Sequence, residues 1–128
     1  MTAMPPPPGP EPAALVQNFL ALMQARDLPA AQALLAPGFC MFFPGGAAMH
    51  RLDELVQWAR QRYRFAGKHF ERFDTCVQSR GAVVYCRGTL YGEWLDGTPF
   101  DGVRFIDRFE IAEGKITRQD VWNDMGEA

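Results

Sequence analysis

The amino-acid sequence predicts an α+β fold, in which three N-terminal helices cover a curved, cone-shaped antiparallel sheet and enclose a pocket. Apolar residues recur at helical spacing only in the first half of the chain, whereas strand alternation and hairpin turns fill the second half. A length of 128 residues, with 48% hydrophobic and 22% charged residues, is typical of a single domain with one core. We therefore expect one domain over residues 12–128, after a proline-rich tail at residues 1–11.

Composition argues against several kinds of partner. The formal net charge of −2 argues against nucleic acid and anionic membrane surfaces. No apolar run approaches the roughly 20 residues of a membrane span, and no signal peptide is visible. Cys40, Cys76 and Cys86 lack metal-binding or redox spacing, which indicates reduced thiols and a cytoplasmic location.

The first expected helix begins at residue 11 or 12, where the proline-rich tail ends. It continues to Arg26, because Leu15, Phe19 and Met23 recur on one face. This face is predicted to pack on the sheet.

Two further helices and a short strand are expected next. Asp27 is a candidate N-cap for a helix over Leu28–Leu35. Phe39–Phe43 is an apolar run of strand length, and a third helix is expected over Leu52–Ala66, with Gly67 as its stop.

Four antiparallel strands are expected in the second half. The first two cover Phe70–Gln78 and Ala82–Trp94, and Asp96-Gly97 is a strong hairpin signal. Pro99 suits the start of the third strand, and Glu113-Gly114 forms the last tight turn.

Asp107 is the most informative residue of the third strand. Phe105, Asp107, Phe109 and Ile111 alternate, so Asp107 shares one face with three apolar side chains. Such a carboxylate is costly unless it is paired, hydrogen-bonded or protonated. Asp107 is therefore a candidate catalytic acid/base, with a buried structural acid as the alternative.

Asp120 is a second candidate catalytic carboxylate, on the fourth strand. Ile116, Arg118, Asp120 and Trp122 alternate and are expected to share the inward face. Asp120 could instead simply pair with Arg118 at the edge of the sheet.

The expected pocket wall is mainly aromatic, although the same residues also fit a plain core. His50 is a candidate at the pocket mouth, with a solvated loop histidine as the alternative. No metal and no cofactor are expected, because the two histidines lack ligand spacing and no phosphate-binding loop or nucleophile motif is present. The candidate substrate-binding residues are Phe19, Phe43, His50, Trp58, Tyr63, Tyr85, Phe105 and Trp122.

The order of elements, with Ile106-Asp-Arg-Phe-Glu-Ile111 followed by Gly114-Lys-Ile116, resembles the nuclear-transport-factor-2-like superfamily, specifically its SnoaL-like branch. The resemblance covers roughly residues 12–124. It implies a cone-shaped α+β barrel and commonly a homodimer that associates through the sheet. Members include polyketide cyclases, ketosteroid isomerases, limonene epoxide hydrolases, dehydratases and non-catalytic scaffolds, so the fold alone does not assign a reaction.

The resemblance to ketosteroid isomerases matches Asp107 to an aspartic acid that binds the enolate oxygen. The tyrosine and the general-base aspartate of those enzymes fall on Phe19 and Phe43, which can neither donate nor accept a proton. Steroid isomerisation by that mechanism is therefore not expected.

The resemblance to epoxide hydrolases matches Asp107 and Asp120 to two water-activating aspartates. The arginine of those enzymes falls on Phe105, with Arg118 as the only local substitute. Polyketide cyclases of the branch rely chiefly on a single aspartate as acid/base, which the sequence meets best.

The resulting hypothesis is a cyclase, isomerase or dehydratase that acts on a hydrophobic carbonyl compound, with Asp107 as acid/base and Asp120 assisting. The alternative is a non-catalytic ligand-binding or dimeric scaffold module, and an epoxide hydrolase comes third. The expected partners are a hydrophobic small molecule and a second copy of the chain, packed sheet to sheet.

Overall fold

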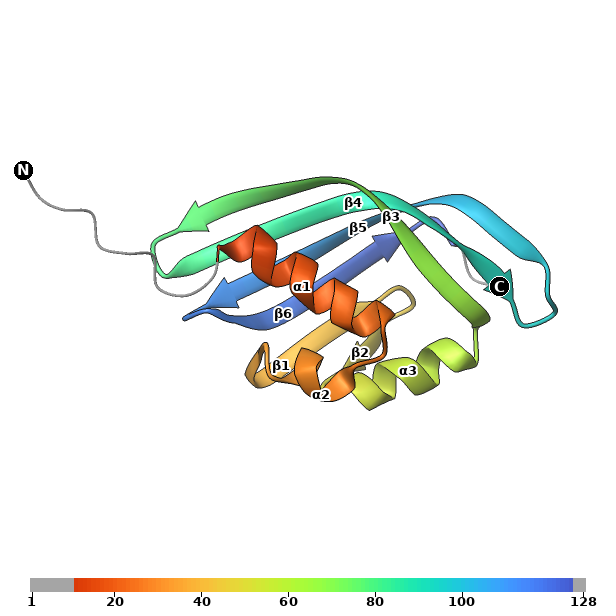
Figure 1. The fold of residues 1–128 in the computed structure, drawn as a ribbon, viewed down its shortest axis with the longest axis horizontal. Helices are drawn as coiled ribbons and strands as arrows, with labels where there is room; N and C mark the ends of the chain where they lie inside the picture. The colour runs from red at the N-terminus through yellow and green to blue at the C-terminus, as the bar shows by residue number, and fades with distance from the viewer. Residues whose placement is uncertain (1–10, 126–128) are drawn as a thin grey trace, which may run out of the picture.

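The computed structural model describes residues 11–125, so the predicted tail lies outside the described residues except for Glu11. Three helices lie on one face of a curved, open six-stranded sheet with the strand order β2-β1-β6-β5-β4-β3 (Figure 1). This arrangement confirms the predicted α+β fold. The elements are α1 (Pro12–Gln24), α2 (Leu28–Gln32), β1 (Leu35–Phe43), β2 (Ala47–Met49), α3 (Leu52–Arg60), β3 (Tyr63–Gln78), β4 (Gly81–Trp94), β5 (Pro99–Ala112) and β6 (Lys115–Asn123).

Helix α1 forms where the sequence predicts it. The Glu11 side chain accepts hydrogen bonds from the first free backbone N–H groups of the helix, at Ala13 and Ala14. Leu15, Phe19 and Met23 are buried on the face that meets the sheet. The Phe19 ring meets the Phe109 ring of β5 edge-on at a centroid distance of 6.0 Å, which ties the helix to the centre of the sheet.

Helix α2 is shorter than predicted. Asp27 caps it as expected, through a hydrogen bond from the Ala30 N–H group. The predicted end at Leu35 is wrong, because Leu35 pairs with Ile116 as the first residue of β1. The strand then bends at Gly38, which has a φ of +78°, before pairing with β6 resumes at Cys40.

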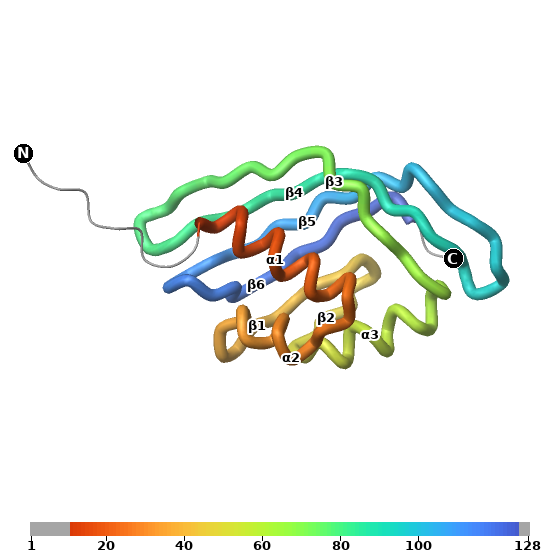
Figure 2. Tube along the Cα trace, viewed as in Figure 1, coloured from red at the N-terminus to blue at the C-terminus, as the bar shows by residue number. Residues whose placement is uncertain are grey.

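Helix α3 also ends earlier than predicted, at Arg60 instead of Ala66. Strand β3 begins at Tyr63 and pairs with β4 as far as Gln78, and Figure 2 shows the two strands following each other along this length. Pairing with β4 therefore outweighs the helical spacing of residues 61–66. This difference matters for function, because it makes residues 63–70 part of the sheet.

The hairpin between β5 and β6 turns where predicted. Glu113 and Gly114 both have positive φ values, of 53° and 74°, as a two-residue type I′ turn requires. Among the described residues, no helix is long and apolar enough to cross a membrane.

Candidate functional site

A cavity of about 520 Å³ lies between the helices and the inner face of the sheet. This volume falls within the roughly 300–1,000 Å³ that is usual for small-molecule sites. The exposed residues Gln24 and Arg26 belong to its wall, so the cavity opens to solvent near the C-terminal end of α1. The predicted site residues that line it are Phe19, Phe43, Trp58, Tyr63, Phe105 and Asp107.

Asp107 lies on the inner face of β5, as its alternation with Phe105 and Phe109 predicts. All three side chains are buried, and Asp107 has an exposed fraction of 0%. Its strand partners are Cys86 on β4 and Val121 on β6, so the carboxylate has an apolar frame on both sides.

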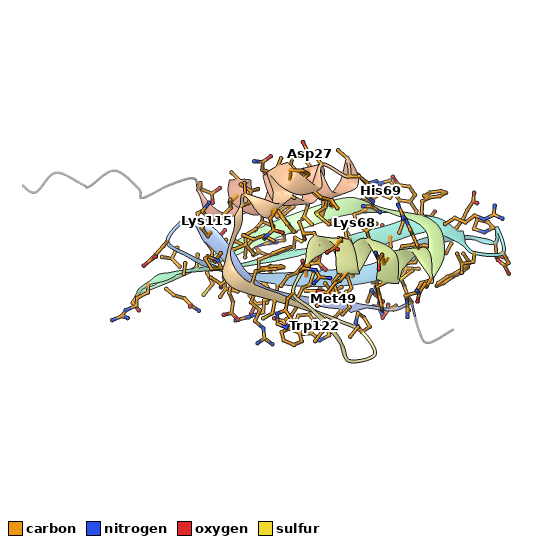
Figure 3. All side chains as sticks on the ribbon, turned by 90° about the horizontal axis from the view of Figure 1, so that it is seen from below. Asp27, Met49, Lys68, His69, Lys115 and Trp122 are labelled. Carbon is orange, nitrogen blue, oxygen red and sulfur yellow. The ribbon has the colours of Figure 1, made fainter. Side chains whose placement is uncertain are left out.

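Lys68 supplies the positive charge that a buried carboxylate requires. Its Nζ donates a hydrogen bond of 2.6 Å to Oδ2 of Asp107, and its side chain retains 26% exposure. Lys68 lies on β3, two strands from Asp107 in the sheet, so the side chain spans the inner face of β4. Figure 3 shows Lys68 on the side of the sheet that the helices cover.

The ion pair determines the protonation of its surroundings. Burial lowers the pKa of the Lys68 ammonium, but the charge and hydrogen bond of Asp107 outweigh burial and hold the pKa above its ordinary value of 10.5. Burial, reinforced by Asp107, raises the pKa of the Cys86 thiol to about 12. Lys68 is therefore a cation and Cys86 a neutral thiol at physiological pH.

Three buried polar atoms in the cavity wall make no hydrogen bond within the described part of the chain. They are Oδ1 of Asp107, Oε1 of Gln119 and Nε of Arg62. Buried polar atoms are nearly always paired, because an unpaired one loses its hydration without compensation. All three residues line one cavity, so two acceptors and one donor without protein partners lie in its wall, which is consistent with a site that binds a polar group.

Asp120 does not join this group, and the prediction that it faces inward is wrong. β6 carries a bulge: Glu110 pairs with Arg118 but the adjacent Ile111 pairs with Ile116, which leaves Thr117 as an extra residue. The extra residue reverses the alternation after Ile116. Gln119 consequently faces the cavity, and Asp120 faces the opposite side of the sheet.

On that opposite face, Asp120 is held by two arginines. Arg118 donates hydrogen bonds of 2.9 and 3.0 Å to its two carboxylate oxygens, and Nη1 of Arg108 lies 3.7 Å away. The structure therefore matches the alternative of a paired carboxylate. A smaller hollow of about 210 Å³ adjoins it, lined in part by Phe42 and Trp122.

Three other predicted pocket residues also lie outside the main cavity. Trp122 is 53% exposed on the face that points away from the helices, as Figure 3 shows, and the bulge in β6 explains this as well. Tyr85 lies on the same outer face, where its hydroxyl accepts a hydrogen bond from Arg108. His50 is exposed before α3, and its ring nitrogen lies 3.4 Å from the carbonyl oxygen of Phe39.

Sequence reasoning missed Lys68, Arg62 and Gln119. Lys68 directly follows the predicted end of the third helix, whereas in β3 the residues Ala66, Lys68 and Phe70 alternate on the face that lines the cavity. No local signal places Gln119 inward, because its orientation depends on the bulge.

Comparisons with known proteins agree with this architecture. None of the curated proteins matches the sequence significantly. Among solved structures, TerC co-crystallised with polyporic acid superposes with a TM-score of 0.74 at 18% identity, covering 88% of this chain and 90% of that one. A candidate ketosteroid isomerase from Shewanella frigidimarina NCIMB 400 gives 0.69 at 18% identity, covering 85% and 92%. A candidate polyketide cyclase from Pseudomonas putida KT2440 gives 0.66 at 19% identity, covering 87% and 90%.

These likenesses establish a shared fold, because identities of this size do not carry an activity with them. The family model of the SnoaL-like domain matches residues 16–119, which is most of the chain. The matched region includes most of α1, all of β3, β4 and β5, and Gln119. The chain belongs to the SnoaL-like domain family, within the nuclear-transport-factor-2-like fold.

Proposed function

We propose that the protein binds a hydrophobic carbonyl compound in the cavity and that Asp107 acts there as a general acid/base. The observation that carries this proposal is a fully buried carboxylate at the cavity wall, with one oxygen bonded to Lys68 and the other free of protein hydrogen bonds. The reaction class is cyclisation, isomerisation or dehydration.

The geometry suits proton abstraction next to a carbonyl group. This step requires a base near the carbon and positive charge near the oxygen on which the enolate develops. Oδ1 of Asp107 is the base, and the Lys68 N–H groups that do not bond Asp107 stabilise the oxygen. The proton then returns to another carbon in an isomerisation, or leaves with a hydroxyl group in a dehydration, so Asp107 is regenerated.

Two other mechanisms of the fold lack their residues in this cavity. Phe19 and Phe43 line it at the positions that are polar in ketosteroid isomerases. Asp120 lies behind the sheet, so the cavity does not contain the two aspartates of an epoxide hydrolase.

A thermal-shift screen tests the proposal. The panel includes polycyclic aromatic ketones, steroids, terpene epoxides and aromatic acids, with polyporic acid included because TerC crystallised with it. A ligand that binds the folded state raises the melting temperature. The best ligand is then incubated with wild type, Asp107→Asn and the exposed control Asp101→Asn, and its conversion is followed by mass spectrometry.

We expect turnover in wild type and Asp101→Asn and a loss of at least about 100-fold in Asp107→Asn, the usual contribution of a general base. Unchanged turnover in Asp107→Asn would contradict the proposed role of Asp107.

The second candidate function is a non-catalytic binding module. It is favoured by the Lys68–Asp107 salt bridge, because a structural ion pair of the same geometry would need no reaction. Binding without any turnover by the wild type would support this alternative.

We also propose that the outer face of the sheet associates with a second copy of the chain. Tyr85, Ile106 and Trp122 are exposed there, next to the Arg108–Asp120–Arg118 network. Light scattering should give the mass of a dimer, and a monomer for Trp122→Arg. The free thiols, with Cys76 exposed, support a cytoplasmic location.

A further inference from the structure

The cavity wall carries more positive than negative charge. Arg26, Arg62 and Lys68 line it, whereas Asp107 is its only carboxylate among the described residues. Pairing Asp107 with Lys68 leaves two arginines unmatched. A neutral ligand would displace water from these cations without supplying a counter-charge, whereas an anionic ligand would supply one.

Arg62 is the cation that is best placed to meet a ligand. Its guanidinium lies over the Trp58 ring at 4.7 Å from the centroid, which holds the plane against the cavity wall. Its Nε is buried without a hydrogen-bond partner, and Arg62 makes no salt bridge with any residue of the described range. A guanidinium with open N–H groups matches a carboxylate or another oxyanion.

Lys68 adds a second donor to the same region. An ammonium has three donors, and only one of those on Lys68 is bonded to Asp107. The Lys68 Nζ also lies 5.0 Å from the centroid of the Phe105 ring, so it borders both the acid and the aromatic part of the wall.

Tyr63 lines the same cavity as the three cations. Burial raises the pKa of its hydroxyl, and the fields of Lys68, Arg62 and Arg26 all act to lower it. The three cations therefore belong to the wall of one cavity.

We propose that the natural ligand is an organic acid, in which an oxyanion on an aromatic or otherwise flat apolar body binds between Arg62 and Lys68. The inference rests on the proposed function, because it takes this cavity as the ligand site. The apolar body lies against Phe19, Phe43 and Phe105, and a hydroxyl group of the ligand donates to Oε1 of Gln119. A carboxylate and an acidic enol or phenol offer the same oxyanion chemistry.

The test compares acids with neutral molecules of nearly the same shape. 2-Naphthoic acid and 2-naphthamide differ in charge, and 2-naphthol bearing nitro groups supplies an acidic phenol instead of a carboxylate. Isothermal titration calorimetry at pH 7.5 gives the dissociation constant of each probe. We expect the better of the two acids to bind at least about 10-fold more tightly than the amide, a difference of about 1.4 kcal/mol.

Matched variants locate this preference. Arg62→Met should reduce the ratio of acid to amide affinity to near one, whereas Arg60→Met, at the exposed end of α3, should leave it unchanged. Lys68→Met combined with Asp107→Asn should reduce the ratio without leaving a buried charge unpaired, and Lys115→Met, at the start of β6, is the lysine control. The preference should also fall between 50 mM and 500 mM salt.

Each outcome has a distinct meaning. If the amide binds as tightly as both acids, the cavity binds ligands but the acid preference is refuted. If the preference survives Arg62→Met and the double variant, the oxyanion lies elsewhere and the assignment is wrong. If no probe binds and no compound class raises the melting temperature, both this inference and the proposed ligand site fail.

Discussion

Removing Lys68 should destabilise the protein much more than removing the whole Lys68–Asp107 pair. Lys68→Met leaves the Asp107 carboxylate without a partner at 0% exposure. Breaking a fully buried pair costs roughly 3–5 kcal/mol, whereas replacing both partners by neutral groups is close to neutral. Because Lys68 is 26% exposed and the cavity admits water, we expect a loss of about 2–4 kcal/mol for Lys68→Met.

The double variant, Lys68→Met with Asp107→Asn, should come within about 1 kcal/mol of the wild type, because no buried charge remains unpaired. Urea unfolding followed by tryptophan fluorescence measures these free energies. The dependence of the free energy of unfolding on urea concentration should be the same for all variants.

The exposed pair Arg72–Asp74 provides the control. The N–O distance of this salt bridge is 2.8 Å, but both side chains are more than half exposed. Arg72→Met should therefore change the free energy of unfolding very little. A wild-type free energy of unfolding for Lys68→Met, or a double variant less stable than Lys68→Met alone, would contradict a stabilising buried pair.

Three further predictions follow from the charges on both faces of the sheet. Asp120→Asn should lower the free energy of unfolding by about 1–2 kcal/mol, because the Asp120 side chain is only 12% exposed and is held by arginines. It should leave the binding of the naphthalene probes unchanged. Weaker probe binding in calorimetry would contradict the outward placement of Asp120. Burial and Asp107 raise the pKa of Cys86 to about 12, so iodoacetamide at pH 8 should modify the exposed Cys76 and spare Cys86. Peptide mass spectrometry measures the labelling of each cysteine, and equal labelling would contradict this prediction. The pKa of Lys68 is higher in the folded state than its value of about 10.5 in the unfolded state. The pair with Asp107 therefore stabilises the fold fully below pH 10.5, and this stabilisation is lost as the pH rises through the folded-state pKa. The difference in free energy of unfolding between wild type and Asp107→Asn should be constant from pH 8 to 10 and shrink above pH 11.

Local patterns predicted much of the architecture. The alternation around Asp107 predicted its burial, and the glycine turns predicted the hairpins, because both depend on a few adjacent residues. The length of α3 was overestimated because residues 61–66 fit a helix locally, and only their pairing with β4 selects the strand.

The candidate site was predicted only in part. Asp107 and the aromatic wall follow from alternation and composition, but its partner Lys68 comes from a strand 39 positions earlier in the chain. No periodicity within one segment reports such a contact. Gln119 and Asp120 exchanged their expected faces because one unpaired residue, Thr117, is enough to reverse a period of two.

The bulge at Thr117 also indicates how a different chemistry could be engineered into this cavity. A second acid beside Asp107 cannot come from Asp120, however close the two are in the sheet, since that side chain belongs to the arginine pairs behind it. Position 119 faces the cavity, as position 121 does, and it lies diagonal to Asp107 across the β5–β6 pair. Gln119→Glu is thus a nearly isosteric substitution expected to create a carboxylate dyad here, and Arg62, in the wall of the same cavity, is a candidate to hold its charge.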